Sequence, residues 1–307
     1  MAQITAKLVK DLRDKTSAGM MDCKKALTET DGDLEAAIDW LRTKGIAKAD
    51  KKSSRVAAEG LVAIAIDGTK GAVVEVNSET DFVARNEEFQ GAVAEITELA
   101  LGAGDFAGLQ AAQTKACTSV TEYLTNLVGK IGENMSLRRM EALEVSEGVV
   151  TGYIHNAVTD NMGKIGVLVA LESSGDAAKL SELGKKIAMH VAATNPLALN
   201  VEDLDDAVVA KERQMLGDEA RESGKPEAII DKMVEGRMTK FFKESVLTTQ
   251  IFVMDGERSI AQVIEDEAKA LGADITLKAY ARMELGEGIE KKEEDFAAEV
   301  AAAVAGS

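Results

Sequence analysis

Residues that could carry out chemistry are of few kinds in this 307-residue chain. Asp and Glu together number 53, so carboxylates lie near one another throughout, and a neighbouring pair is weak evidence for general acid–base catalysis. Only His155 and His190 are histidines, and His190 lies in an apolar helical segment, which favours a buried structural histidine over a metal ligand. Cys23 and Cys117 are too far apart in sequence to build a disulfide framework. We therefore expect no catalytic residues, no metal site and no cofactor.

Glycine-rich sequences that would bind a nucleotide are missing as well. The chain has no G-x-x-x-x-G-K-[ST] motif. Its glycine-rich segment 102–108 has the wrong spacing for a dinucleotide site and follows a predicted helix instead of a strand. We do not expect this chain to bind nucleotide itself.

The most informative residues are Thr80, Asp81, Phe82 and Val83, which follow an apolar, β-branched run at 71–76. Aromatic residues make up only 4% of the chain, yet Phe82 stands in a polar turn. An aromatic side chain at a loop tip is a candidate wedge for a second protein. The alternative is that Phe82 folds back as a hydrophobic staple on a helix beginning near Asn86.

The composition excludes several classes of function. A formal net charge of −17 makes nucleic-acid binding unlikely, because phosphate contacts need clustered Lys and Arg. No apolar run approaches the roughly 18 residues of a membrane span, and residues 1–5 lack the basic-then-apolar layout of a signal peptide. We expect a cytoplasmic protein that binds neither nucleic acid nor membrane.

Apolar residues at helical spacing predict three short helices at the N-terminus, within residues 4–12, 21–27 and 33–45. Asp33 is a plausible N-cap of the third helix, and Gly45 stands where a helix commonly ends. Residues 48–55 are expected to form an exposed linker.

Met20 and Met21 are adjacent at the start of the second predicted helix. Successive helical side chains point about 100° apart, so we expect one of the two to be exposed as a partner contact. The alternative places one methionine in the core and the other at a loosely covered helix start.

The middle of the chain contains a repeated pattern. Strands at 61–66 and 72–76 form a predicted hairpin, and a helix follows from about Glu87 to Leu101. Glu147-Gly148-Val149-Val150 then echoes Glu59-Gly60-Leu61-Val62, and a strand at 166–171 and a helix at 180–193 follow it. This indicates a duplicated unit, and the second copy lacks a loop phenylalanine. The difference favours a functional role for Phe82.

The remaining segments complete an α+β fold. Residues 201–242 are charged and helical with a break at 223–226, which predicts an antiparallel helical hairpin projecting from the second unit. A helix at 260–271 and a strand at 275–284 follow. Phe296, Val300 and Val304 lie on one face of a predicted C-terminal helix. The predicted domains are 1–54, a three-helix module; 55–140, the first half of the core; 141–285, its second half with hairpin 201–242 inserted; and 286–307, a C-terminal helical module.

Several motifs occur in a fixed order along the whole chain, and together they make it resemble the bacterial elongation factor Ts family. The motifs are Thr16-Ser17-Ala18-Gly19-Met20-Met21-Asp22-Cys23-Lys24-Lys25-Ala26-Leu27, Thr80-Asp81-Phe82-Val83, Lys130-Ile131-Gly132-Glu133-Asn134, Ile187-Ala188-Met189-His190-Val191-Ala192-Ala193 and Gly286-Glu287-Gly288-Ile289-Glu290-Lys291. The resemblance implies a ubiquitin-associated-like N-terminal bundle, a two-part core, an inserted coiled-coil hairpin and a C-terminal module. It also implies a nucleotide exchange factor, not an enzyme, that binds elongation factor Tu both with GDP and nucleotide-free.

The resemblance assigns roles to individual residues. The loop with Asp81 and Phe82 is implied to intrude beside the Mg²⁺ and phosphate end of the partner's GDP site and dislodge the ion. Met20 and Met21, with the terminal helix around Phe296 and Val300, are implied to face the partner's nucleotide-binding domain. His155 is implied to lie near another partner domain, although residues 156–162 lengthen the turn after it. The hairpin is implied to form a homodimer or a 2:2 complex. The alternative function is a helical protein-binding adaptor without exchange activity.

Overall fold

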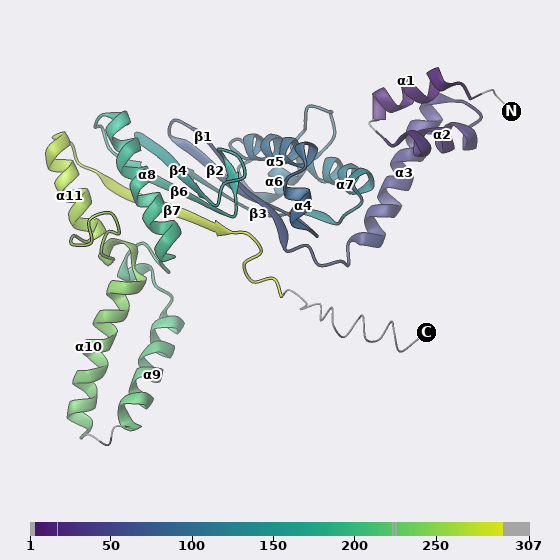
Figure 1. Cartoon of the computed structure of the whole chain (residues 1–307). Coiled ribbons are helices and arrows are strands. Elements are labelled where there is room, and N and C mark those ends of the chain that lie inside the picture. The colour runs from purple at the N-terminus through teal and green to yellow at the C-terminus, as the bar shows by residue number, and fades with distance from the viewer. Residues whose placement is uncertain (1–3, 17, 223, 225, 291–307) are drawn as a thin grey trace.

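The computed structural model describes residues 4–16, 18–222, 224 and 226–290. A helical bundle lies at one end, two antiparallel sheets with their helices form the middle, and a helical hairpin projects from the far end (Figure 1). The expected mixed α+β architecture, with N-terminal helices followed by two antiparallel sheets, is confirmed. The predicted C-terminal helix with Phe296, Val300 and Val304 lies outside the described residues.

The N-terminal bundle consists of α1 (Ala6–Thr16), α2 (Met20–Glu29) and α3 (Leu34–Lys52). Asp33 caps α3 as predicted, since its side chain accepts a hydrogen bond from the Ala36 N–H at 3.0 Å. The buried core of the bundle is small: Val9, Leu12, Cys23, Ala26, Leu27 and Ala37.

Helix α3 does not end at Gly45, and the expected linker at 48–55 is wrong. The helix continues to Lys52 and contacts α7 (Val120–Ile131). The reason is steric: a Cβ added at Gly129 of α7 would lie 3.3 Å from the Cα of Gly45. The absence of a side chain at Gly129 therefore lets α7 pack closely on α3 at Gly45, where we had expected α3 to end.

The first sheet contains β1 (Glu59–Asp67), β2 (Lys70–Ser78), β3 (Met135–Glu144) and β5 (Met162–Gly163), in the order β3-β2-β1-β5. Four helices pack on one of its faces: α4 (Asp81–Ala84), α5 (Glu87–Ala100), α6 (Phe106–Ala111) and α7. Their apolar side chains join those of Leu61, Ala63 and Val74 in one core.

The second sheet contains β4 (Gly148–His155), β6 (Ile165–Glu172) and β7 (Thr276–Glu284), in the order β4-β6-β7. Helix α8 (Ala177–Thr194) and helix α11 (Ile260–Leu271) supply the apolar side chains that pack with it. In each sheet a hairpin receives a third antiparallel strand beside its second strand, and the register shifts once along that pairing. Gly60 and Gly148, which lie at the starts of the matching first strands, have φ angles of 122° and 120°.

The two sheets pack against each other through their remaining faces. Val62, Ile64 and Val73 of the first sheet lie with Val150 and Leu168 of the second in one buried cluster. This approach leaves no room for larger residues at Gly71 and Gly166. A Cβ at Gly71 would lie 2.6 Å from Val150 Cγ1, and one at Gly166 would lie 2.7 Å from Val62 Cγ1.

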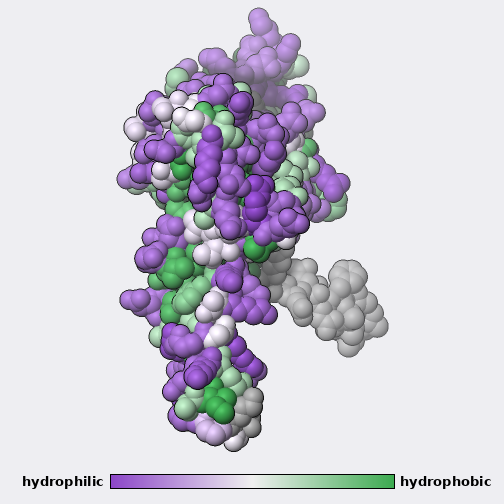
Figure 2. Space-filling model, turned by 90° about the vertical axis from the view of Figure 1, so that its left-hand side faces the viewer, coloured by the Kyte–Doolittle hydropathy of each residue, from purple (hydrophilic) through white to green (hydrophobic). Residues whose placement is uncertain are grey.

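The projecting hairpin consists of α9 (Asp206–Glu222) and α10 (Glu227–Ser245), with short 3₁₀ turns η1 (Val201–Asp203) and η2 (Leu247–Thr249) at its base. Its two ends meet, because the Leu197 N–H donates to the Ser245 carbonyl at 2.8 Å and Ala198 bridges to Val246. Along the arm, hydrophobic patches alternate with hydrophilic residues (Figure 2). The exposed apolar residues of α9 and α10 include Val208, Met215 and Ile229.

Candidate partner-binding site

Phe82 projects into solvent from the short helix α4, and 77% of its surface is exposed. Its neighbours Val83 and Ala84 are buried in the core of the first unit. Because successive helical side chains diverge by about 100°, burial of Val83 and Ala84 turns Phe82 outward. The sequence predicted an open loop here, whereas the structure has one turn of helix.

The hydrophobic-staple alternative for Phe82 is wrong. Helix α5 begins at Glu87 and is capped by the Asn86 side chain, which accepts from the N–H groups of Glu88 and Phe89 at 2.9 and 3.1 Å. Phe89 is fully buried in the core, whereas Phe82 is 77% exposed and covers nothing at the start of α5. Phe82 is left without a role in the core.

Side chains from distant elements hold both ends of α4. At its start, Glu133 accepts from the Thr80 N–H at 2.9 Å and from the Thr80 hydroxyl at 2.7 Å. At its end, the Gln90 side-chain amide donates to the Ala84 carbonyl at 2.9 Å. Neither Glu133 nor Gln90 was expected to have a separate role. Glu133 belongs to one of the motifs quoted above, but its 53-residue separation from Thr80 concealed the contact.

Asp81 lies on the exposed side of α4 beside Phe82, and its carboxylate is 3.9 Å from the Arg85 guanidinium. Both side chains are largely exposed, so this ion pair contributes little to stability. A shallow hollow lined by Arg85, Asn86, Glu87 and Glu88 continues this polar surface. The site thus presents an apolar wedge flanked by charge.

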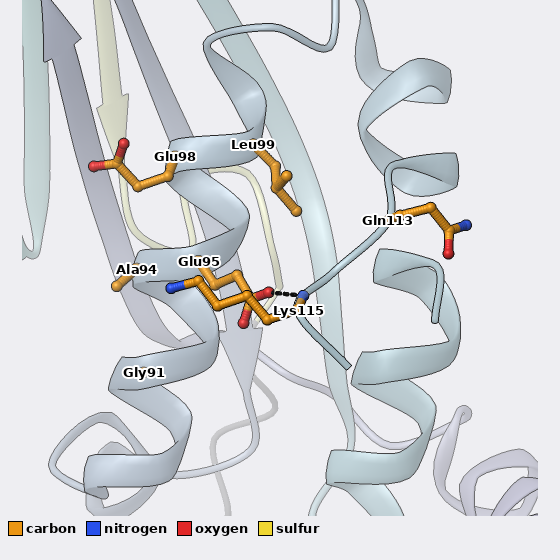
Figure 3. Close-up of a pocket in the computed structure, with 7 residues that line it drawn as sticks. All are labelled: Gly91, Ala94, Glu95, Glu98, Leu99, Gln113 and Lys115. Atoms are coloured by element: carbon orange, nitrogen blue, oxygen red, sulfur yellow. Dashed lines mark hydrogen bonds between the residues drawn. The ribbon is translucent and has the colours of Figure 1, made fainter. Parts of the chain in front are cut away.

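A second hollow lies between α5 and the chain around Lys115 (Figure 3). The Glu95 carboxylate, which lines it, accepts a hydrogen bond from the Lys115 backbone N–H. The Lys115 side chain extends across α5, and Gln113 points away from it (Figure 3). These contacts join a helix to a loop, and we assign this hollow no ligand.

Met20 and Met21 are both exposed, at 60% and 76%, where we expected only one to be. The buried stripe of α2 is Cys23, Ala26 and Leu27. Met20 is one turn before Cys23, on the same side of α2, but it is the first helical residue and lies beyond the small core. The two methionines therefore form an uncovered apolar tip on the bundle.

His155 is exposed at the end of β4, with Nδ1 3.1 Å from the Tyr153 hydroxyl. The lengthened turn after it has a structural use that the sequence did not reveal. It leads into β5, which pairs with β1 through Val62 opposite Gly163. A two-residue strand is too short to produce a detectable alternation in the sequence. Phe82, the two methionines and His155 thus come from three separate elements, and the predicted contacts Phe296 and Val300 lie outside the described residues.

His190 is a buried core histidine, as predicted. Its Nε2 is 2.9 Å from Gln250 Oε1, and its Nδ1 accepts from the Val253 N–H at 3.3 Å. Burial lowers the pKa of the imidazole, only partly opposed by the Gln250 hydrogen bond. Within the described ranges, no group of three or more His, Cys, Asp or Glu residues is placed to hold a metal ion.

Glu75 is a buried carboxylate that the sequence analysis missed, at 0% exposure on β2. It is 3.0 Å from the Arg138 guanidinium and 2.5 Å from that of Arg139, and it accepts from the Gly286 N–H at 2.8 Å. Burial opposes ionisation, but the Gly286 and Arg139 hydrogen bonds outweigh it and hold the pKa of Glu75 below its ordinary value. The cluster fixes the chain just after β7 against the first sheet.

Comparison with known proteins agrees with this arrangement. A family model described as elongation factor TS matches residues 79–287, which include α4, the whole second sheet, the hairpin, and β3 and β5 of the first sheet. Proteins named elongation factor Ts from Maricaulis maris (strain MCS10) and Sphingopyxis alaskensis (strain DSM 13593 / LMG 18877 / RB2256) are each 60% identical over 99% of both chains. The protein of that name from Rhizorhabdus wittichii is 58% identical over 100% of both chains.

The chain belongs to the elongation factor Ts family. It is therefore a nucleotide exchange factor for elongation factor Tu and not an enzyme. The alternative of an adaptor without exchange activity does not agree with this membership. No helix in the described part of the chain is long and apolar enough to cross a membrane.

Proposed function

We propose that this protein binds elongation factor Tu in its GDP-bound and nucleotide-free forms, and releases GDP by pressing Asp81 and Phe82 against the Mg²⁺ and phosphate end of the nucleotide site. The observation that carries the proposal is the exposure of Phe82 on a helix anchored at both ends. Because both ends of α4 are anchored, the Phe82 side chain can displace groups of the partner. On an unanchored segment it would move aside instead.

The energetic scale supports a wedge. Full burial of a phenylalanine side chain contributes about 1.5–3 kcal/mol. Coupling between two ligands that oppose each other on one protein is typically about 1–3 kcal/mol. If Phe82 is buried fully only when the partner has lost its ion, that burial alone supplies coupling of the usual size. Mg²⁺ requires a near-ideal octahedral shell, so a small movement of its ligands weakens its binding.

Other contacts supply binding without this coupling. We assign Met20 and Met21, with Phe296 and Val300 of the C-terminal module, to the partner's nucleotide-binding domain, and His155 to another partner domain. The corresponding division of the chain is a ubiquitin-associated-like module at 1–54, core halves at 55–140 and 141–285, and a C-terminal module at 286–307. As a factor of translation elongation, the protein is proposed to work in the cytoplasm.

The projecting hairpin is proposed to mediate self-association, as a homodimer or a 2:2 complex with elongation factor Tu. Its exposed apolar residues Val208, Met215 and Ile229 would supply the contact. Isolated apolar residues on a charged arm are common, so the oligomeric state must be measured with the arm shortened.

The mechanism is tested by following release of fluorescent GDP from purified elongation factor Tu, with catalytic amounts of the chain, in excess Mg²⁺ and again in a chelator. If the chain acts through the ion, its acceleration should be large in Mg²⁺ and much smaller once the ion is gone. Equal acceleration under both conditions would contradict the Mg²⁺ mechanism and leave family membership untouched.

A further inference from the structure

The corner between α7 and β3, residues 132–134, joins the N-terminal bundle to the helix that carries Phe82. Helix α7 ends at Ile131, and its C-cap Gly132 has a φ of 93° that turns the chain sharply. The next two residues, Glu133 and Asn134, then direct side chains or backbone groups to segments far away in the sequence. The corner is therefore a junction of three elements.

On one side, the corner holds the residues that precede Phe82. Both carboxylate oxygens of Glu133 are used on Thr80, one by its N–H and one by its hydroxyl. The Asn134 N–H donates to Glu79 Oε1 at 2.5 Å. Hydrogen bonds to an ionised carboxylate are about twice as strong as neutral ones. Two consecutive residues, Glu79 and Thr80, are thus fixed immediately before α4.

On the other side, the corner holds the end of α3. The Lys52 ammonium donates to the Gly132 carbonyl, and the Asn134 side-chain amide donates to the Arg55 carbonyl at 2.8 Å. Arg55 in turn pairs with Glu79 at 3.3 Å. The bundle that carries Met20 and Met21 is consequently connected to the start of α4 through hydrogen bonds as well as through the chain.

Helix α4 needs such support because it has only four residues. A single helical turn is not stable by itself, since helix nucleation is unfavourable. Burial of Val83 and Ala84 keeps the segment near the core, but burial is non-directional and does not fix the helix axis. The Glu133 contacts with Thr80 fix the first turn and so determine where Phe82 points.

We propose that Glu133 is a positioning residue for nucleotide exchange, which acts through Thr80 to hold Phe82 in its wedge direction. The inference rests on the proposed role of Phe82. Glu133 does not need to touch elongation factor Tu. Its removal should leave the fold and the binding of nucleotide-free partner largely intact, yet lower the acceleration of GDP release.

The test compares Glu133→Ala, Glu133→Gln and Thr80→Val with the control Glu122→Gln. Glu122 lies in the first turn of α7 and pairs with Arg42 at 2.6 Å, so the control removes a carboxylate from the α3–α7 contact without touching Thr80. GDP release, affinity for nucleotide-free elongation factor Tu and thermal unfolding are measured for each. We expect Glu133→Ala to lower exchange by about tenfold, the scale of one charged hydrogen bond, and Glu133→Gln to restore part of it through its remaining acceptor oxygen.

Combining the changes with Phe82→Ala separates positioning from a merely structural effect. If Glu133 acts through Phe82, Glu133→Ala should cause no further loss of exchange in the Phe82→Ala background. The inference would be overturned if the double variant lost exchange by the product of the two single losses. It would also be overturned if Glu133→Ala exchanged normally, or if it lost much of its affinity for nucleotide-free partner. If Glu133→Ala does not fold, Glu133→Gln and Thr80→Val are judged by the same criteria. Normal exchange by Phe82→Ala alone would instead reject the wedge itself.

Discussion

Gly129 of α7 packs on the backbone of Gly45 in α3 where the two helices cross, and a Cβ at Gly129 would lie 3.3 Å from the Gly45 Cα. This contact makes α3 a continuous strut between the N-terminal bundle and the core. The bundle is therefore docked by helix packing in a region where the sequence predicted an exposed linker. The position of Met20 and Met21 relative to Phe82 depends on this crossing.

The two glycines should respond differently to substitution. Gly129→Leu introduces a good helix former whose side chain cannot fit against Gly45, so we expect α3 to separate from α7 and the melting temperature to fall. A Cβ at Gly45 meets no atom within 4 Å, so Gly45→Ala should stabilise α3 by about 0.5–1 kcal/mol through helix propensity. Thermal unfolding and limited proteolysis after Lys52 would show both effects. Equal melting temperatures for the two variants would contradict the crossing.

Glu75 should be essential for stability. Glu75→Gln removes the buried carboxylate that Arg138 and Arg139 share, although Arg139 keeps its pair with Glu287 at 3.1 Å. We expect a loss of about 3 kcal/mol in unfolding free energy, near the lower end for buried pairs, because both arginines are partly exposed. Urea unfolding at neutral pH measures it. The control is Glu172→Gln, whose exposed pair with Lys278 should be worth less than about 1 kcal/mol. Similar losses in the two variants would show that the Glu75 cluster contributes no more than a surface pair.

The same carboxylate gives stability a defined dependence on acid pH. Because the folded pKa of Glu75 is lowered, the folded state binds its proton less readily than the unfolded chain. Its contribution is complete above the unfolded carboxyl pKa and is lost as the pH falls through the lower folded value. The stability difference between the parent chain and Glu75→Gln should therefore shrink on acidification, and a constant difference would be inconsistent with an ionised Glu75.

His190 should produce a separate effect at milder pH. Its folded pKa is lowered by burial, so the unfolded chain binds the proton first as the pH falls below the ordinary imidazole pKa of about 6.5. Stability should be full above that pH and fall below it, by at most about 1.4 kcal/mol per pH unit. His190→Gln, which can still donate and accept, should flatten this part of the profile in urea titrations at pH 5 to 7. A slope unchanged by the substitution would show that other groups cause it.

The exposed methionines should act on binding alone. Met20→Ala and Met21→Ala should each weaken elongation factor Tu binding by about 1–3 kcal/mol if the residue is a buried anchor in the complex. Neither should alter thermal unfolding, because both side chains are exposed in the free protein. Met254→Ala, which truncates an exposed methionine of the second unit that has no assigned contact, is the control in calorimetric titration. Parent-like affinity for both N-terminal variants would remove α2 from the interface.

The projecting arm should be separable from the fold. Replacing residues 212–237 by a short Gly-Ser linker keeps the base, where Leu204, Val246 and Ala198 form their own buried cluster. We expect the shortened protein to unfold cooperatively and to self-associate less in sedimentation experiments. A shortened protein that remains dimeric would assign self-association to another surface.

The sequence predicted most regular elements because their signals are local. The alternating and apolar runs at 59–78 and 148–172 predicted the strands of those segments, and the apolar residues at helical spacing in 260–271 predicted α11. No prediction was made for α7 or β3, and the predictions failed where the decisive contact is distant. Gly45 was expected to end a helix because its contact with Gly129 is not visible in the sequence. Strand β5 has only two residues, too few to show an alternation of apolar and polar residues. The hydrogen bond between Glu133 and Thr80 joins residues 53 positions apart.

The candidate site was predicted in part for the same reason. An aromatic residue in a polar turn singled out Phe82 from composition alone, and its exposure agrees with that reading. The prediction that only one of Met20 and Met21 is exposed was wrong. The sequence does not reveal how far the small core of α1, α2 and α3 extends toward Met20.

The most direct test of the central claim is the affinity of Phe82→Ala for elongation factor Tu, measured with and without saturating GDP. Linkage requires that GDP weakens factor binding by the same ratio as the factor weakens GDP binding. A wedge creates this ratio, so Phe82→Ala should bind nucleotide-free partner nearly as well as the parent and lose much less affinity when GDP is added. Ile251→Ala, which truncates an exposed apolar side chain of the second unit, is the control and should keep the parent ratio. A Phe82→Ala protein that binds more weakly in both states, with the parent ratio unchanged, would contradict the wedge mechanism.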